Sequence, residues 1–311
     1  MESLIQNNPG RFRFRRLTRA ETRQLLTGLA FISPWIIGFV VFTFYPVISA
    51  FRYSLTRYDL IRPPVWVGFK NYIDLITIDP NFPKVVYNTF YWVLFSVPIG
   101  VIAAFLMASL LNTEIKGRSF FRAVFFFPSI IPAVVVAMVW QFLLNAQFGV
   151  FNAALQGMGL PTIPFIANPD LAKPSLILIN TWAQGSAIII FLAALQDVPR
   201  SLYEAAIVDG ASAWNRFWNV TVPLTTPAIM FVLTTGFIFG FQVFTIPWLM
   251  TQGGPNNATE FIAVFLYRNA FVNLRMGKAS ALAWMLFVVV VIFAVSLFKS
   301  SRYWVHYSSD E

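Results

Sequence analysis

Residues 199–223 read PRSLYEAAIVDGASAWNRFWNVTVP and predict two short helices on either side of a glycine. Ser201 followed three residues later by Glu204 has the spacing of a capping box at the start of the first helix. Gly210 is expected to end that helix, and Ser212 can cap the second. The segment therefore predicts a helix-turn-helix loop rather than a membrane-crossing element.

The two predicted helices present different surfaces. Trp214, Phe217 and Trp218 fall at positions i, i+3 and i+4, so one face of the second helix is aromatic and can lie against the ends of membrane helices. Ala205 and Ala206 leave the first helix almost smooth. A smooth helix suits close insertion into a groove on another protein.

The chain on both sides of this loop is too apolar for a water-soluble domain. Hydrophobic residues make up 58% of the 311 residues and charged residues only 11%, whereas soluble domains carry about one-quarter charged residues. A charge at the bilayer centre costs roughly 2.5 to 3.5 kcal/mol, so charge-free runs are the candidate spans. We therefore predict an all-α integral membrane protein with six transmembrane helices, at about 27–51, 85–111, 123–144, 174–196, 224–250 and 279–298. Pro128 and Pro132 predict a kink in the third of these helices.

The distribution of Lys and Arg predicts the orientation. Residues 1–26 carry six arginines, and the short loop 112–122 adds three basic residues, so both are expected in the cytoplasm. Nine basic residues fall on the opposite side, so the bias is not uniform. The predicted organisation is a basic N-terminal segment (1–26), a transmembrane domain (27–298) with a cytoplasmic loop (197–223), and a cytoplasmic tail (299–311). The chain is thus expected to be a multi-pass protein of the cell inner membrane with both termini in the cytoplasm.

Several functional classes lack the residues they need. The net charge of +9 does not indicate nucleic-acid binding, because the basic residues flank apolar runs. There is no cysteine, and His306 is the single histidine, which argues against thiolate or HExxH metal sites and a Ser-His-Asp triad. The single Gly277-Lys278 pair has Val272 where a phosphate-binding loop needs its first glycine, so ATP binding of that kind is not expected.

The loop resembles a known family motif. Glu204-Ala205-Ala206, Asp209-Gly210 and Pro223 are similar in spacing and identity to the EAA loop of ABC importer permeases. In that family the loop forms a coupling helix that docks on a cytoplasmic ATPase subunit. The resemblance implies this role for Glu204, Ala205, Ala206, Asp209 and Gly210. The alternative is that Glu204 only caps a helix and that the alanines only favour helicity.

The resemblance extends from about residue 30 to residue 298. It includes Val67-Gly-Phe-Lys-Asn-Tyr72, Asn88-Thr89, Gly253-Gly254-Pro255 with Thr259, Tyr267, Ala270-Phe271 and Gly277-Lys-Ala-Ser-Ala281. These motifs are similar to the sugar-permease branch, and in particular to maltose and glycerol-phosphate permease subunits. The large outer domain and extra N-terminal helices of the maltose subunit are absent, which implies the simpler six-helix form of a type I ABC importer permease.

The resemblance also implies partners. The chain would form a heterodimer with a second permease subunit and assemble with two cytoplasmic ABC ATPase subunits that bind the ATP. An extracytoplasmic solute-binding protein would deliver a sugar or sugar-like solute. The chain itself is expected to be no enzyme and to hold no cofactor or metal.

Uncharged polar and aromatic residues in the fourth and fifth predicted helices could contact such a solute by hydrogen bonds to hydroxyls and stacking on sugar rings. The candidates are Asn180, Trp182, Gln184, Ser186, Phe239 and Gln242. By the resemblance, Asn180 and Phe239 match residue types that contact sugar in the maltose subunit. The alternative role for each is helix-helix packing.

Two other functions stay open at this point. An ion-coupled secondary carrier would usually place Asp, Glu, His or Lys within its spans, and the predicted spans hold none. A membrane enzyme acting on lipids would need clustered His, Asp or Glu near a membrane face, which the sequence does not show.

Overall fold

The computed structural model describes residues 18–114 and 116–306. The predicted basic segment lies largely outside the described residues, as do Arg11, Arg13, Arg15 and Arg16, and so does the end of the predicted tail. The chain divides into two units, residues 1–50 and 51–311.

The described part of the first unit is helical. α1 (Arg19–Phe39) is followed by the π-helical segment η1 (Val40–Phe44) and by α2 (Tyr45–Ser54), which continues into the second unit. Thr18 and Glu21 form a capping box, in which the Thr18 hydroxyl accepts from the Glu21 N–H and the Glu21 carboxylate accepts from the Thr18 N–H. Pro46 has no N–H to give to the carbonyl of Phe42, which accounts for the widened helical turn before it.

The second unit is organised around α4 (Phe82–Asn112), the longest of the described helices. α4 contacts α8 (Pro169–Trp182), α9 (Gly185–Asp197), α13 (Thr226–Phe241) and α15 (Ile262–Tyr267), and α13 also contacts α16 (Met276–Ser301). Small residues allow α13 to approach α4 closely. A Cβ atom at Gly236 or Gly240 would lie 2.9 or 3.0 Å from a methyl group of Val97 on α4.

Among the described residues, three helical segments are long and apolar enough to cross a membrane, namely Arg19–Ser54, Phe82–Asn112 and Met276–Ser301. Three bent helix pairs raise the number to six if each pair crosses once. They are Arg118–Ile130 with Ala133–Leu143 at 101°, Pro169–Trp182 with Gly185–Asp197 at 47°, and Ala213–Leu224 with Thr226–Phe241 at 64°.

The predicted spans thus differ from the structure at their breaks. The third predicted span has much more than a kink, because α5 (Arg118–Phe126) and the 3-10 turn η2 (Phe127–Ile130) end in extended backbone at Ile131 and Pro132 before α6 (Ala133–Leu143). The fifth predicted span, 224–250, is longer than the helix that the structure shows there. α13 ends at Phe241, and the short helix α14 (Thr245–Thr251) follows separately. Pro247 has no N–H for the carbonyl of Val243, so the helical ladder is not continued there.

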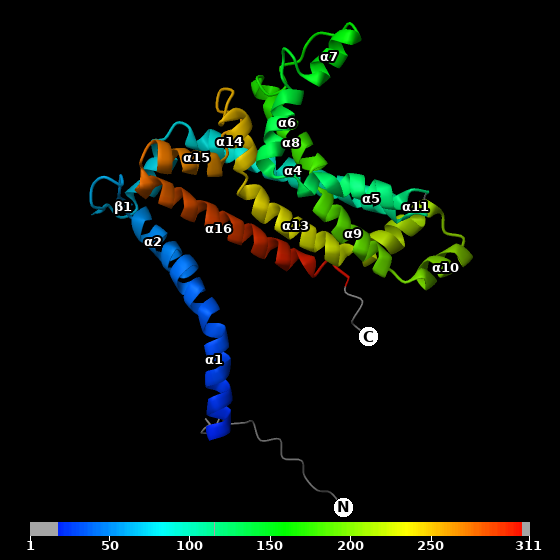
Figure 1. Ribbon diagram of the computed structural model, residues 1–311, viewed down its shortest axis with the longest axis horizontal. Coiled ribbons are helices and arrows are strands. Elements are labelled where there is room, and N and C mark those ends of the chain that lie inside the picture. The colour runs from blue at the N-terminus through cyan, green and yellow to red at the C-terminus, as the bar shows by residue number, and fades with distance from the viewer. Residues whose placement is uncertain (1–17, 115, 307–311) are drawn as a thin grey trace, which may run out of the picture. The chain divides into compact units, whose positions relative to one another are not determined.

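The loops gather at opposite ends of the second unit (Figure 1). At one end lie the short hairpin of β1 (Thr56–Arg57) and β2 (Val65–Trp66), in which Thr56 pairs with Trp66, together with α3 (Lys70–Thr77), α15 and η4 (Arg268–Val272). At the other end lie α10 (Arg200–Val208), α11 (Ala213–Arg216), η3 (Phe217–Thr221) and α12 (Val222–Leu224). α7 (Val150–Gly157) follows α6.

The contact between the hairpin and α16 depends on a glycine, which gives a test of the packing at this end. Gly277 donates its N–H to the carbonyl of Tyr58, and a Cβ atom there would lie 2.0 Å from the carbonyl oxygen of Thr56. Gly277→Ala should therefore lower the thermal unfolding midpoint of the purified protein, with a cost of about 1–3 kcal/mol for overpacking. Gly157→Ala is the matched control, because a Cβ there meets nothing within 4 Å. Equal midpoints for the two variants would contradict this packing.

Candidate functional site

The 199–223 loop folds as two short helices joined at Gly210, as predicted. Gly210 has φ +76°, a left-handed conformation that favours glycine. Its N–H donates to the carbonyl of Ile207, and the Ala211 N–H donates to the carbonyl of Ala206. This is the Schellman arrangement that ends a helix.

The caps of the two helices are only partly as predicted. Ser212 accepts a hydrogen bond from the Asn215 N–H at 3.2 Å, which confirms its capping role. The predicted capping box of Ser201 and Glu204 is wrong, because α10 begins after Pro199 and has no side-chain cap. Proline fixes the backbone at this boundary, so Ser201 already lies within the first turn.

α10 has no buried residue in this chain. Glu204, Ala205, Asp209 and Gly210 are exposed, and Ala206 is half-buried. The apolar side chain of Val208 is 87% exposed, so the helix presents an uncovered and partly apolar surface.

The loop is nevertheless attached firmly to the helices behind it. The hydroxyls of Tyr203 and Thr221 lie 3.0 Å apart and connect α10 to η3. Arg216 Nη1 donates to the carbonyl of Ala211 at 2.7 Å. The ring of Phe217 packs on Phe105 of α4, with centroids 5.9 Å apart. Side-chain contacts therefore connect α10 to η3 and η3 to α4.

The aromatic face predicted for the second helix is present as a cluster. Trp214 stacks on Phe217 with ring centroids 6.2 Å apart, and Trp218 meets both rings edge to face. Trp214 and Trp218 are exposed. Indole rings are common at the level of lipid headgroups, so this position suits the end of a membrane helix.

A cavity of about 310 Å³ lies among α4, α8, α9 and α13. Four of the predicted solute contacts line it, namely Asn180, Gln184, Ser186 and Phe239. The ring of Phe239 is 72% exposed. Amide, hydroxyl and aromatic groups thus meet in one concave place.

The polar groups of the cavity are held in position by α4. Asn180 Nδ2 donates to Ser96 Oγ at 2.8 Å, and Gln184 Nε2 donates to the carbonyl of Asn180 at 3.2 Å. A Cβ atom at Gly100 would lie 2.9 Å from Gln184 Nε2, so the glycine leaves the room that this side chain occupies. Within the described residues, the side-chain oxygens of Asn180 and Gln184 accept no hydrogen bond, which leaves them able to accept from hydroxyls.

The two remaining predicted contacts do not line this cavity. Trp182 packs edge to face on Trp140, with ring centroids 5.6 Å apart. The exposed Gln242 donates its Nε2 to the carbonyl of Ile238 on its own helix at 2.8 Å. Trp182 is two residues from Asn180 on α8 and therefore points to a different face of that helix, and Gln242 comes just after α13 ends at Phe241.

The sequence analysis did not select the residues with which α4 lines this cavity. Trp92, Ser96, Val97 and Val101 line the cavity. The signal was available, since Asn88, Trp92, Ser96 and Gly100 recur every four residues and therefore share one face of the predicted second helix.

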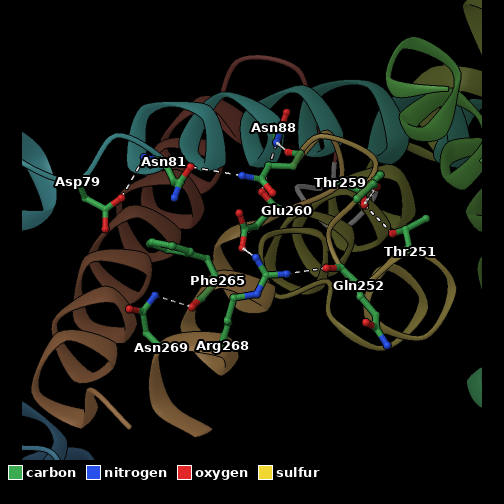
Figure 2. A network of polar contacts seen from close by, with 12 residues as sticks. Asp79, Asn81, Asn88, Thr251, Gln252, Thr259, Glu260, Phe265, Arg268 and Asn269 are labelled. Atoms are coloured by element: carbon green, nitrogen blue, oxygen red, sulfur yellow. Dashed lines mark hydrogen bonds and ion pairs between the residues drawn. The ribbon is translucent and has the colours of Figure 1, made fainter. Parts of the chain in front are cut away.

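A polar network joins α4 to the loop before α15 (Figure 2), at the end of the second unit opposite α10 (Figure 1). The Asn88 Nδ2 group on α4 donates to the carbonyls of Asn257 and Glu260 at 2.8 and 3.3 Å. Lys173 Nζ donates to Asn88 Oδ1 at 2.8 Å and lies about 5 Å from the ring centroids of Tyr87 and Tyr91. The network joins α4 and α8 to the loop that precedes α15.

Glu260 is fully buried and forms an ion pair with Arg268. Arg268 Nη2 also donates to the carbonyl of Gln252 at 2.6 Å, while the buried Glu260 Oε2 has no partner among the described residues. Burial raises the pKa of Glu260, and the charge and hydrogen bond of Arg268 only partly oppose this. Gly253, with φ +87°, lies against both side chains, where a Cβ atom would be 3.2 Å from Arg268 Nη2 and 3.3 Å from Glu260 Cβ.

Other quoted motif residues also hold the loops of this end. Asn71 Nδ2 donates to the carbonyls of Ser54 and Thr56 at 2.7 and 2.8 Å. Thr89 Oγ1 accepts from the Ile262 N–H at 2.9 Å, and Thr259 Oγ1 donates to the carbonyl of Gly254 at 2.7 Å. Asp79 forms an ion pair with Lys278. Burial alone would raise the pKa of Asp79. Hydrogen bonds from Lys278 and from the Asn81 N–H have the larger effect, so the pKa lies below its ordinary value.

The chain is similar in sequence to a known family and to several known proteins. Residues 86–304 match the family described as "Binding-protein-dependent transport system inner membrane component". The chain is 40% identical to the probable ABC transporter permease protein YesP of Bacillus subtilis, over 94% of this chain and 96% of that protein. It is 30% identical to the trehalose/maltose transport system permease protein MalF of Thermococcus litoralis, over 92% and 97% of the two chains.

A solved structure has the same fold. The chain superposes with a TM-score of 0.82 and 26% identity on a subunit of a bacterial alginate ABC transporter in complex with an alginate pentasaccharide-bound periplasmic protein. The match covers 93% of this chain and 98% of that chain.

The buried ion pair of Glu260 and Arg268 gives a test of this polar network. Arg268→Met should leave the Glu260 carboxylate buried without its partner and lower the free energy of unfolding by roughly 3 kcal/mol, measured by thermal or denaturant unfolding of the purified protein. Adding Glu260→Gln to this variant removes the charge and should restore most of the loss. Arg275→Met, at an exposed position near the same end, is the control. If Arg268→Met alone were as stable as Arg275→Met, the stabilising role of the Glu260–Arg268 pair would be contradicted.

Proposed function

Because this chain belongs to the family of binding-protein-dependent transport system inner membrane components and is a permease subunit of an ABC importer, we propose that it moves a sugar or sugar-like solute into the cytoplasm by alternating access. The relatives named for trehalose/maltose, for multiple sugars and for sn-glycerol-3-phosphate support this solute class. The family is a membrane transport component and not an enzyme.

The observation that carries the mechanism is the uncovered surface of α10 on a firmly attached loop. An exposed helix with the small side chains of Ala205 and Ala206 beside Glu204 can fill a groove on a cytoplasmic ATPase subunit. The packing of the Phe217 ring on Phe105 connects the loop that carries this helix to α4. Closure of two ATPase subunits on ATP would then push α10 and tilt the bundle. ATP would be bound by these partners and not by this chain.

The proposed assembly contains three further kinds of partner. A second permease subunit would form a heterodimer with this chain and complete the cavity. Two ABC ATPase subunits would contact the coupling residues Glu204, Ala205, Ala206, Asp209 and Gly210. An extracytoplasmic solute-binding protein would deliver the solute. The alginate transporter structure, which is a complex with an alginate pentasaccharide-bound periplasmic protein, supports this partner.

We place α10 and both termini in the cytoplasm of a cell whose inner membrane holds the chain. The nine basic residues at the opposite end weaken the charge bias that predicts this orientation. Three of them are engaged locally, since Arg268 pairs with Glu260, Lys278 with Asp79, and Lys173 contacts Asn88. Residues 1–26 carry six arginines close to the first membrane helix, and this concentration of basic residues supports a cytoplasmic N-terminus.

The solute would occupy the cavity of Asn180, Gln184, Ser186 and Phe239. Amide oxygens and the serine hydroxyl can hydrogen-bond to sugar hydroxyls, and the exposed ring of Phe239 can stack on an apolar sugar face. Trp182 and Gln242, which do not line the cavity, are assigned to packing and to the helix end.

Gly210 tests the coupling helix. Gly210→Val forces a β-branched residue into left-handed backbone, while Gly210→Asn keeps a residue that tolerates it. In the purified complex with its ATPase and solute-binding protein, Gly210→Val and Ala206→Trp should reduce solute uptake at least tenfold and leave membrane insertion intact. Gly210→Asn should retain uptake. The measurement is transport per ATP hydrolysed, together with stimulation of hydrolysis by the binding protein.

Three outcomes would count against the proposed function. Normal uptake in both Gly210→Val and Ala206→Trp would remove the coupling role. Absence of any ATPase from the purified complex, or transport without one, would favour a self-sufficient carrier.

Phe239 tests the solute cavity. Loss of a stacking ring is worth about 0.5–1.5 kcal/mol, so Phe239→Ala should raise the apparent KM for the transported sugar roughly threefold to tenfold. Phe231→Ala is the matched control, because Phe231 is an exposed phenylalanine of the same helix that does not line the cavity. Equal uptake kinetics for the two variants across a panel of sugars would assign Phe239 to packing.

A further inference from the structure

A second cavity lies between α4, α5 and α9, near the end that carries the coupling loop. Its volume is about 240 Å³, and all but one of its lining residues are apolar: Leu111, Ala123, Phe126, Ile188, Ile189 and Leu192. The exception is Arg122. An apolar groove with a cation in its wall is chemically unlike the solute cavity, whose lining has no charged residue.

A second arginine accompanies Arg122. Arg118 lies one helical turn earlier on α5, so the two side chains share a face. The Gln196 amide of α9, with its oxygen toward them, accepts from Arg122 Nη2 at 2.9 Å and from Arg118 Nη2 at 3.1 Å. One neutral oxygen thus holds two guanidinium groups together.

The charge of this pair is not balanced within the chain. Among residues 18–114 and 116–306, neither arginine forms an ion pair, and the buried Arg122 Nε has no hydrogen-bond partner. Two like charges held close together attract an anion, and the fork of donors on arginine fits the oxygens of a phosphate.

The surroundings of α5 suit a lipid. Phe120, Val124 and Phe127 are exposed on this segment, as expected for side chains that face hydrocarbon. Arg118 is the first residue of α5, and Arg122 lies one turn later, directly before the apolar residues 123–127. This position suits the level where headgroups meet the bilayer core. Under the orientation proposed above, this level belongs to the cytoplasmic leaflet.

We propose that Arg118, Arg122 and the adjoining cavity form a binding site for an anionic phospholipid of the cytoplasmic leaflet, with the phosphate on the two guanidinium groups and part of an acyl chain in the groove. Gln196 is a positioning residue in this site, because it holds the arginines side by side. The site lies between α5 and α9, and α9 carries Ser186 and follows directly on Gln184, so an occupied groove would also brace these two helices.

The test measures lipid retention, and it requires no transport. The purified permease complex is titrated with phosphatidylglycerol, phosphatidylcholine or inorganic phosphate, and bound species are counted by native mass spectrometry. The wild-type complex should retain phosphatidylglycerol in preference to phosphatidylcholine. Each basic residue near an anionic lipid contributes about a factor of five, so Arg118→Gln/Arg122→Gln should weaken retention roughly thirtyfold.

Two further variants separate charge from shape. Lys299→Gln/Arg302→Gln removes two charges at the end of α16 and should leave retention unchanged. Ile189→Trp fills the groove without altering charge and should also reduce retention. Thermal unfolding midpoints are recorded for every variant, so that a misfolded protein is recognised.

Three results would overturn the proposal. Equal retention in wild type and the double arginine variant would show that the arginines hold no lipid. Inorganic phosphate binding as tightly as phosphatidylglycerol, with no effect of Ile189→Trp, would indicate a free anion site. Loss of the second permease subunit in Ile189→Trp, with lipid retention unchanged, would identify the groove as a subunit interface. Transport data would bear on the importer function independently of all three.

Discussion

The exclusion of charge from hydrocarbon is the constraint on which the rest of this structure depends. Because an unpaired charge in lipid is costly, charged side chains gather at the two ends of the second unit. At one end they are arranged as local pairs, such as Glu260 with Arg268 and Asp79 with Lys278. Between the ends, polarity is limited to amides and hydroxyls such as Asn180 and Ser96, which are held by neighbours. The same constraint therefore accounts for both the topology and the uncharged lining of the cavity among α4, α8, α9 and α13.

Features that follow from local chemistry could be predicted from the sequence. Charge-free runs gave the approximate positions of all the long helices and bent pairs, and Gly210 and Ser212 gave the turn between α10 and α11. Four of the six proposed solute contacts lie in one cavity because they were chosen as polar or aromatic residues in otherwise apolar helices. The expected coupling role of α10 remains a prediction that its exposure supports.

What could not be predicted depends on contacts between distant segments. The break at Ala183–Gln184 comes with close packing of Gly185, where a Cβ atom would lie 2.8 Å from Ser129 Oγ and 2.9 Å from the Phe126 carbonyl oxygen. Proline positions indicated a bend near residue 130, but its size of 101° depends on the extended backbone at Ile131 and Pro132. Trp182 lies only two residues after Asn180 on α8, so the two side chains point to different faces of the helix, and Trp182 packs on Trp140 instead of lining the cavity.

α4 reaches from one set of loops to the other without interruption. Its 31 residues, at about 1.5 Å each, extend over roughly 46 Å. Near its beginning, Asn88 donates to the carbonyl of Asn257. Farther along, Ser96 lines the cavity shared with α8, α9 and α13, and Phe105 packs on Phe217 of η3. Because one continuous helix contacts both sets of loops, a ligand or antibody that restrained Asn88 and its partners would also restrict the movement of Phe105 and of the η3 segment packed on it.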